Sequence, residues 1–245
     1  MNKSNLIMTA FNNAVKEIQY DKICMVSDIY WDPLLIPNGI DFFHTPRGRA
    51  IPFSAGLKLG NPKLKVAVFI GDLATIGGNH LMHAARRNIE ILVICINNFI
   101  YKEIGNFSPE KFSCYSESER PFNIPHLAKS CGSIYVARWT ALHTKELTNT
   151  IVEAFNKSGL SVIEVMSPGA NYFAGIENST KESEILKYYY ENSEIKNNEE
   201  TNNLDIKSGK KIIVGKFVDR KRMKFIDSYN AQLSRILGDK FKRYG

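Results

Sequence analysis

Short apolar runs alternate along this chain with segments in which apolar positions recur every three or four residues. The apolar runs predict buried strands over residues 23–26, 65–70, 91–96, 133–137 and 160–165. The periodic segments predict helices over residues 6–18, 47–59, 76–87, 123–130 and 145–157. Residues 31–43 contain prolines and a glycine and are expected to form a loop. This alternation predicts an α/β fold with a doubly wound, mostly parallel sheet.

The chain changes character after residue 176. We predict an α/β domain over residues 1–176 and a C-terminal extension over residues 177–245. The extension begins with a polar helix and continues into an Asn-, Glu- and Lys-rich stretch at about 196–211, which reads as a mobile linker. A closing strand and an amphipathic helix follow. We expect the extension to pack on the domain or on a partner subunit.

Composition and charge narrow the class of protein. A chain of 245 residues with 44% hydrophobic content can bury a sizeable core. No apolar run reaches the roughly 20 residues of a membrane span, and the first 20 residues do not resemble a signal peptide, so we predict a cytoplasmic protein. The net charge is +7, but basic and aromatic residues are not interleaved, which disfavours nucleic acid. A solvated face, or a face towards an acidic partner, explains the charge better.

Polar residues stand where two of the predicted strands end. Gly71-Asp72 follows the run over residues 65–70, Asn97-Asn98 ends the run over 91–96, and Gly77-Gly78 opens the helix between them. Neighbouring parallel strands end at one edge of the sheet, where ligands bind. Carboxylate and amide oxygens suit Mg²⁺, and backbone N–H groups at a glycine turn and a helix N-terminus suit phosphate. The pattern predicts a site for a phosphorylated cofactor that carries Mg²⁺.

This arrangement resembles the thiamine diphosphate (TPP) motif, Gly-Asp-Gly followed at a distance by Asn-Asn. The stretch IGGNHLMHAARRNIEILVICINNFIY is similar to the β subunit of 2-oxoacid:ferredoxin oxidoreductases, the 2-oxoglutarate type in particular. The likeness extends upstream to HTPRGRAIPFSAGLKLGNPKLKV and downstream to PFNIPHLAKSCGSIYVARWT, GLSVIEVMS and GKFVDRKRMKFIDSYNAQLSRILG. It covers nearly the whole chain in order, and it implies the TPP-binding fold.

The resemblance also implies roles for particular residues. The implied Mg²⁺ ligands are the side chains of Asp72 and Asn98 and the carbonyl of Ile100. The implied cofactor-binding residues are these three together with Gly71, Gly77, Gly78 and Asn79. The implied catalytic residues, near the substrate, are His44, Arg47 and Arg49. The family implied uses TPP for oxidative decarboxylation of a 2-oxoacid, passes electrons through an iron–sulfur cluster to ferredoxin, and works with an α-type companion subunit or as an oligomer.

Several stretches depart from the family pattern. The Gly-Asp-Gly-Asp turn is two residues shorter here, Arg47 replaces a histidine, and residues 102–106 replace a glycine-rich loop. The four cysteines, Cys24, Cys95, Cys114 and Cys131, form no CxxC pair and match none of the positions that hold the cluster. Ile29-Tyr30-Trp31-Asp32 stands around one such position and Ser167-Pro168-Gly169 around another. We therefore expect no iron–sulfur cluster in this chain.

Two interpretations stay open on the sequence. In the first, the chain is a working subunit that binds TPP with Mg²⁺ and sends its electrons through a partner. In the second, it is a catalytically inactive β-like paralogue with a structural or regulatory role. The departures fall on stretches that contact the cofactor, which favours the second interpretation. Asp72, Asn98 and the Gly77-Gly78-Asn79 turn are retained, which favours the first.

Overall fold

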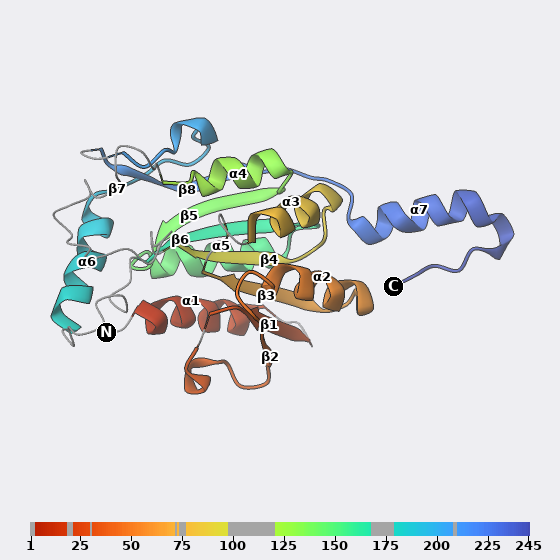
Figure 1. The fold of residues 1–245 in the computed structure, drawn as a ribbon, viewed down its shortest axis with the longest axis horizontal. Helices are drawn as coiled ribbons and strands as arrows, with labels where there is room; N and C mark the ends of the chain where they lie inside the picture. The colour runs from red at the N-terminus through yellow and green to blue at the C-terminus, as the bar shows by residue number, and fades with distance from the viewer. Residues whose placement is uncertain are drawn as a thin grey trace.

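An eight-stranded sheet forms the centre of the protein (Figure 1). The structure is a computed structural model, and it describes residues 3–18, 22–29, 31–71, 73, 77–97, 121–167, 179–207 and 210–245. The strands are β1 (Ile23–Ser27), β2 (Asp41–His44), β3 (Lys65–Ile70), β4 (Leu92–Asn97), β5 (Tyr135–Thr140), β6 (Ser161–Met166), β7 (Ser193–Ile195) and β8 (Ile212–Asp219). Their order is β2-β1-β3-β4-β6-β5-β8-β7, and of the described strand pairs only β5 and β8 run antiparallel. The predicted mostly parallel sheet is confirmed.

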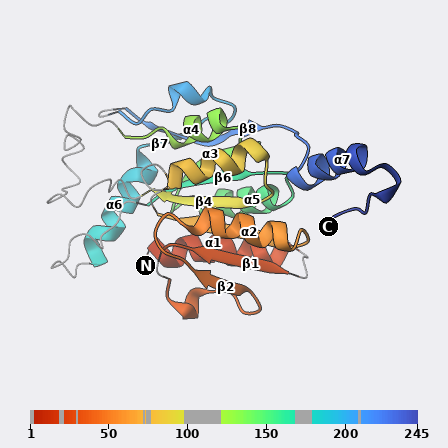
Figure 2. The same ribbon diagram turned by 45° about the vertical axis from the view of Figure 1, so that its right-hand side comes forward.

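Helices cover both faces of this sheet. They are α1 (Lys3–Glu17), α2 (Ala50–Gly60), α3 (Gly78–Arg87), α4 (Ile124–Cys131), α5 (Thr144–Phe155), α6 (Ser179–Glu191) and α7 (Phe225–Leu237). Helices α2, α3 and α4 lie on one face and α1 and α5 on the other (Figures 1 and 2). In β3, Val66, Val68 and Ile70 pack towards α2, α3 and α4, whereas Ala67 and Phe69 pack towards α1 and α5. Because both faces are covered, the strand is apolar throughout, as the sequence predicts.

The order of the strands marks one position on the edge where the parallel strands end. Strand β1 pairs with β2 on one side and with β3 on the other. The chain therefore moves one way from β1 to β2 and then crosses back to the opposite side of β1 to form β3. Such a reversal leaves a crevice outside the carboxyl ends of the two strands, and ligands of open α/β sheets bind there. Asp28, after β1, and Gly71, after β3, stand at this position.

One expectation differs from the structure. Residues 41–43, predicted to be the end of a loop, belong to the edge strand β2. This strand is short and largely exposed, so its sequence shows no buried apolar run. Within residues 196–211, predicted to be a mobile linker, Thr201 and Leu204 are buried, and Lys196 N–H donates to the Val214 carbonyl at 2.8 Å. The mobility of this stretch stays a prediction.

The C-terminal helix α7 extends away from the sheet and its covering helices (Figures 1 and 2). It begins near the amino ends of the strands, since Phe225 N–H donates to the carbonyl of Asn88, just before β4. No helix in the described part of the chain is both long and apolar enough to span a bilayer.

Candidate functional site

The carboxylate of Asp28 joins the two loops that meet at the strand-order reversal. Its Oδ2 accepts the N–H of Gly48 at 2.7 Å, and its Oδ1 accepts the N–H of Gly71 at 3.1 Å. Asp28 is buried; the hydrogen bond from Gly48 is buried as well, and the one from Gly71 is partly buried. The bridge fixes the loop after β2, which carries Arg47 and Arg49, relative to the turn after β3.

Arg49 then connects this loop to helix α3. Its Nη1 lies 3.2 Å from Nε2 of His80, in the first turn of the helix. A guanidinium has no acceptor, so Arg49 donates and the imidazole nitrogen accepts. Burial, together with the positive charge of Arg49, lowers the pKa of His80. The lowered pKa favours the neutral ring that this contact requires.

The start of α3 presents backbone donors at the same edge. Gly77 precedes the helix and Gly78 and Asn79 form its first residues. The first N–H groups of a helix have no partner inside it and attract anions. Backbone donors of this kind suit the phosphate end of a diphosphate cofactor. The predicted metal ligands Asp72, Asn98 and Ile100 lie outside the described residues.

A buried polar network lies within the sheet close to this edge. The Nδ2 of Asn97, the last residue of β4, donates to Glu164 Oε1 at 2.7 Å. The Nε of Arg138 donates to Glu164 Oε2 at 2.6 Å, and Arg138 Nη1 donates to the Leu204 carbonyl at 2.9 Å. The Arg138 and Glu164 side chains are 0% exposed. The network ties β4, β6, β5 and the C-terminal extension together, and it fixes Asn97 immediately before the predicted ligand Asn98.

The structure brings together some of the predicted site residues. Gly71, Gly77, Gly78 and Asn79 lie at the carboxyl edge, where the sequence predicts them, and His44 ends β2 at the same edge. Of the three implied catalytic residues, Arg49 contacts His80 of α3 through its side chain, and the His44 and Arg47 side chains are exposed. Sequence reasoning assigned no role to Asp28, Arg138 or Glu164. The available signals were an aspartate directly after the first strand and opposite charges inside two apolar strands.

Two of the described cysteines, Cys24 and Cys95, lie apart in the sheet. Cys24 in β1 and Cys95 in β4 are buried, as predicted, and β3 lies between their strands. Two strand spacings amount to about 10 Å, so these thiols do not converge. Burial, reinforced by the charge of Asp41, raises the pKa of Cys24 to about 11, whereas a cluster ligand must be a thiolate.

Trp31 fills the space after β1. It is buried, its indole packs edge-on against Phe69 with ring centroids 5.3 Å apart, and its Nε1–H donates to Ser27 Oγ at 3.0 Å. This is one of the stretches where the sequence suggested a lost cluster ligand. An aromatic side chain packed into the core takes up the volume there.

Comparison with known proteins identifies the family. The family profile described as "Thiamine pyrophosphate enzyme, C-terminal TPP binding domain" matches residues 31–165. A 2-oxoglutarate synthase subunit KorB from Methanothermobacter marburgensis is 40% identical over 223 residues, which are 86% of this chain and 77% of that subunit. A 2-oxoacid:ferredoxin oxidoreductase subunit beta from Saccharolobus solfataricus is 35% identical over 181 residues, 68% of this chain and 59% of that subunit. The chain belongs to the 2-oxoacid:ferredoxin oxidoreductase β subunits.

The fold of this β subunit agrees with a solved relative. A structure of 2-oxoglutarate:ferredoxin oxidoreductase from Magnetococcus marinus, with 2-oxoglutarate, coenzyme A and succinyl-CoA bound, matches with a TM-score of 0.75 and 24% identity. The match covers 96% of this chain and 85% of that one. The predicted TPP-binding fold is confirmed. As a β subunit of a multi-subunit oxidoreductase, the chain has companion subunits.

Proposed function

We propose that this β subunit binds TPP with Mg²⁺ and serves a complex that oxidatively decarboxylates a 2-oxoacid. The observation that carries the proposal is the edge at the strand-order reversal, where Asp28 and Arg49 fix the loop after β2 against the turn after β3 and the start of α3. The relatives named 2-oxoglutarate synthase support 2-oxoacids as the substrate class. The complex contains an α-type companion subunit, a homo-oligomer of this chain or both, and it acts in the cytoplasm.

The predicted site residues each have a part in this proposal. When bound, TPP supplies a nucleophilic carbon and an electron sink for decarboxylation. Asp72, Asn98 and the Ile100 carbonyl would hold Mg²⁺, and the N–H groups of Gly77, Gly78 and Asn79 would face the diphosphate. Arg47 and Arg49 supply positive charge at the substrate end, and His44 lies on the same edge. Because we expect no cluster in this chain, it passes electrons to a ferredoxin-like carrier through its partners.

A specific contact supports the alternative of an inactive paralogue. The N–H of Gly71, one of the residues predicted to line the diphosphate, already donates to Asp28. The carboxylate also places a negative charge close to where the diphosphate would bind, which weakens binding of an anion. With the shortened turn, this contact favours a subunit that keeps the fold and its partner surfaces for a structural or regulatory role.

Titration calorimetry of TPP into the chain purified with its companion subunit tests the proposal. We expect Mg²⁺-dependent saturation near one TPP per chain, and Asp72→Ala should abolish the Mg²⁺-dependent binding because it removes a carboxylate ligand. Asp239→Ala, which removes an exposed carboxylate on the C-terminal segment, should bind as the parent does. If the intact complex binds no TPP, the enzyme proposal fails and the inactive paralogue is the better description.

Iron and sulfide analysis tests the electron route separately. The chain, purified anaerobically and separated from its companion, is expected to contain neither element, because Cys24 and Cys95 lie apart in the sheet. Stoichiometric iron in the separated chain would contradict this expectation and would indicate that electrons leave through a cluster in this subunit.

A further inference from the structure

The C-terminal arm, residues 220–245, carries an apolar stripe whose far end, at Ile236 and Leu237, the chain leaves uncovered. Tyr229, Leu233, Ile236 and Leu237 recur at the spacing of one helix face in α7. Ile236 is 77% exposed and Leu237 is 44% exposed. Figures 1 and 2 show α7 extending away from the layered sheet from both viewpoints. A helix with this pattern normally buries its apolar face against another surface.

The arm also holds most of the excess positive charge. It contains eight Lys and Arg residues against two Asp residues, a side-chain charge of +6. The whole chain has +7, so the other 219 residues together contribute only +1. The charge of this protein is therefore concentrated in the arm, with Arg220, Lys221, Arg222 and Lys224 at its root and Arg235, Lys240, Lys242 and Arg243 along and after the stripe.

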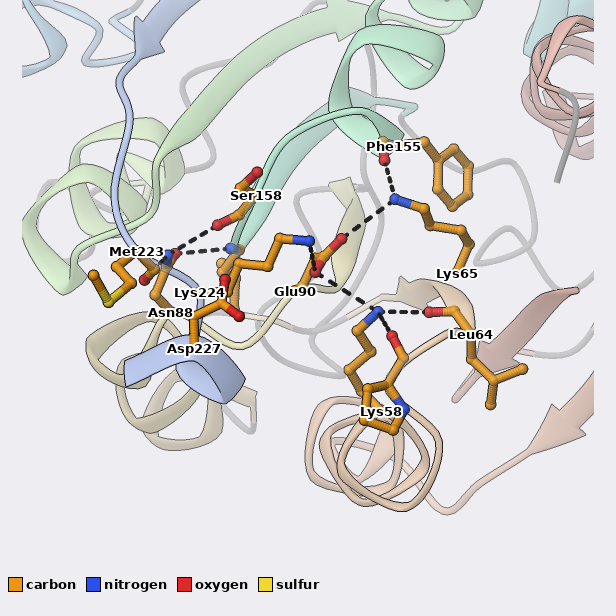
Figure 3. Close-up of polar contacts among 12 residues, drawn as sticks. Lys58, Leu64, Lys65, Asn88, Glu90, Phe155, Ser158, Met223, Lys224 and Asp227 are labelled. Atoms are coloured by element: carbon orange, nitrogen blue, oxygen red, sulfur yellow. Dashed lines mark hydrogen bonds and ion pairs between the residues drawn. The ribbon is translucent and has the colours of Figure 1, made fainter. Parts of the chain in front are cut away.

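The direction of the arm is fixed at its root (Figure 3). Asn88, in the left-handed conformation after α3, donates from Nδ2 to the carbonyls of Met223 at 2.9 Å and Ser158 at 3.1 Å. A Cβ on Gly159 would meet the Asn88 side chain at 1.9 Å, so only glycine permits this approach. The Nζ of Lys224 lies 3.0 Å from Glu90 Oε2.

Glu90 links the arm to the body of the protein through further lysines. Lys65 Nζ lies 3.3 Å from Glu90 Oε1 and donates to the Phe155 carbonyl, and Lys58 Nζ lies 3.8 Å from Glu90 Oε2. Burial lowers the pKa of Lys58 to about 8. Arg222 donates to the Ala85 carbonyl at the end of α3. An arm held by so many polar contacts at its base has a set orientation.

The end of the chain folds back along one side of α7. Asn230 and Tyr244 exchange two hydrogen bonds, at 2.8 and 2.9 Å, and Arg243 pairs with Asp227 at 3.2 Å. The tail orders the helix without covering Ile236. The arm is thus an ordered element with a preformed exposed face, which lowers the entropic cost of docking.

We propose that the stripe of α7 docks into an apolar, acid-rimmed groove on the companion subunit, an inference that rests on the proposed assembly. Complementary charge supports this occupant: the +6 arm attracts an acidic rim and repels a second copy of itself. An amphipathic helix laid into a groove by its apolar face is a common mode of recognition. The arm starts near the amino ends of the strands, across the sheet from the candidate cofactor edge, so its docking assembles the complex and leaves that edge open.

Affinity for the companion subunit tests the docking. Ile236→Ser should raise the dissociation constant about tenfold or more, since it removes a central apolar side chain from the contact. Ala231→Ser, a matched change on the opposite face of α7, should stay within about twofold. Raising NaCl should weaken binding of the parent chain, because exposed charges are screened. The side chains replaced in both variants are exposed, so the melting temperatures of the variants should match that of the parent.

Each other result has a defined meaning. Equal affinity of parent and Ile236→Ser overturns the docking. So does dimerisation of the chain alone that Ile236→Ser abolishes, which would assign the stripe to a second copy. Binding of duplex RNA that depends on Ile236 would overturn it as well. TPP titration on the same samples separates the two proposals. Equal companion affinity of parent and Ile236→Ser, in a complex that binds TPP, overturns only this inference. Absence of TPP binding in an intact complex whose affinity depends on Ile236 overturns only the proposed function.

Discussion

Replacing Glu164 by leucine is expected to lower the free energy of unfolding by about 3–5 kcal/mol. The change leaves the guanidinium of Arg138 buried without its carboxylate partner, and Arg138 Nη2 already has no hydrogen-bond partner among the described residues. The amide of Asn97 also loses its acceptor. Urea unfolding monitored by circular dichroism measures the loss. Because Asn97 ends β4, TPP affinity of the complex should fall as well.

Two further variants show whether the lower free energy of unfolding comes from the buried, unpaired charge of Arg138. The double variant Arg138→Met/Glu164→Leu removes both charges and should recover much of the lost stability, since a buried ion pair adds little over well-packed apolar groups. Glu200→Gln breaks the exposed pair with Lys129 and should change stability by no more than about 1 kcal/mol. A double variant less stable than Glu164→Leu would contradict the explanation.

Replacing Asp28 by alanine is expected to cost about 2 kcal/mol or more, because it removes the acceptor of two backbone N–H groups. Under the proposed function, TPP affinity also falls, since the loop after β2 and the turn after β3 are no longer held together. Asp32→Ala is a suitable control: its carboxylate accepts a single exposed N–H, from Leu34, and its loss should cost about 1 kcal/mol or less.

The isosteric Asp28→Asn variant decides between the two functional interpretations. It removes the negative charge and keeps one carbonyl acceptor at the same position. If Asp28 holds the two loops in place for a working site, calorimetry on the complex shows weaker TPP binding in Asp28→Asn than in the parent. If its charge repels a diphosphate, binding appears or strengthens in the variant, and the parent chain is the inactive paralogue.

The fold could be predicted largely because its strands are buried on both faces. A strand such as β3 must be apolar at every position, and Val66 to Ile70 shows this without any knowledge of its neighbours. Strand β2 has no such signature, since its side chains are mostly exposed and only its pairing with β1 defines it. The ordering of Leu204 likewise depends on a partner, Arg138, that lies 66 positions away in the sequence.

The same distinction applies to the candidate site. Gly71 and the Gly77-Gly78 turn could be placed because each stands next to a strand or a helix end that the sequence predicts. The role of Asp28 could not be predicted. Its two partners, Gly48 and Gly71, come close to it only because the chain crosses over β1. The sequence shows opposite charges at positions 138 and 164. It does not show that β5 and β6 place these two residues directly opposite each other.

The antiparallel strand β8 belongs to the extension after residue 176 but pairs with β5 of the preceding domain. We therefore do not expect residue 176 to divide two units that fold separately. Strand β8 covers the free backbone groups of β5, and β7 in turn pairs with β8. Without them, β5 would become an open edge whose unpaired N–H and C=O groups invite aggregation with other chains. The extension therefore completes the sheet of the domain that precedes it, so the two are expected to fold and unfold as one cooperative unit.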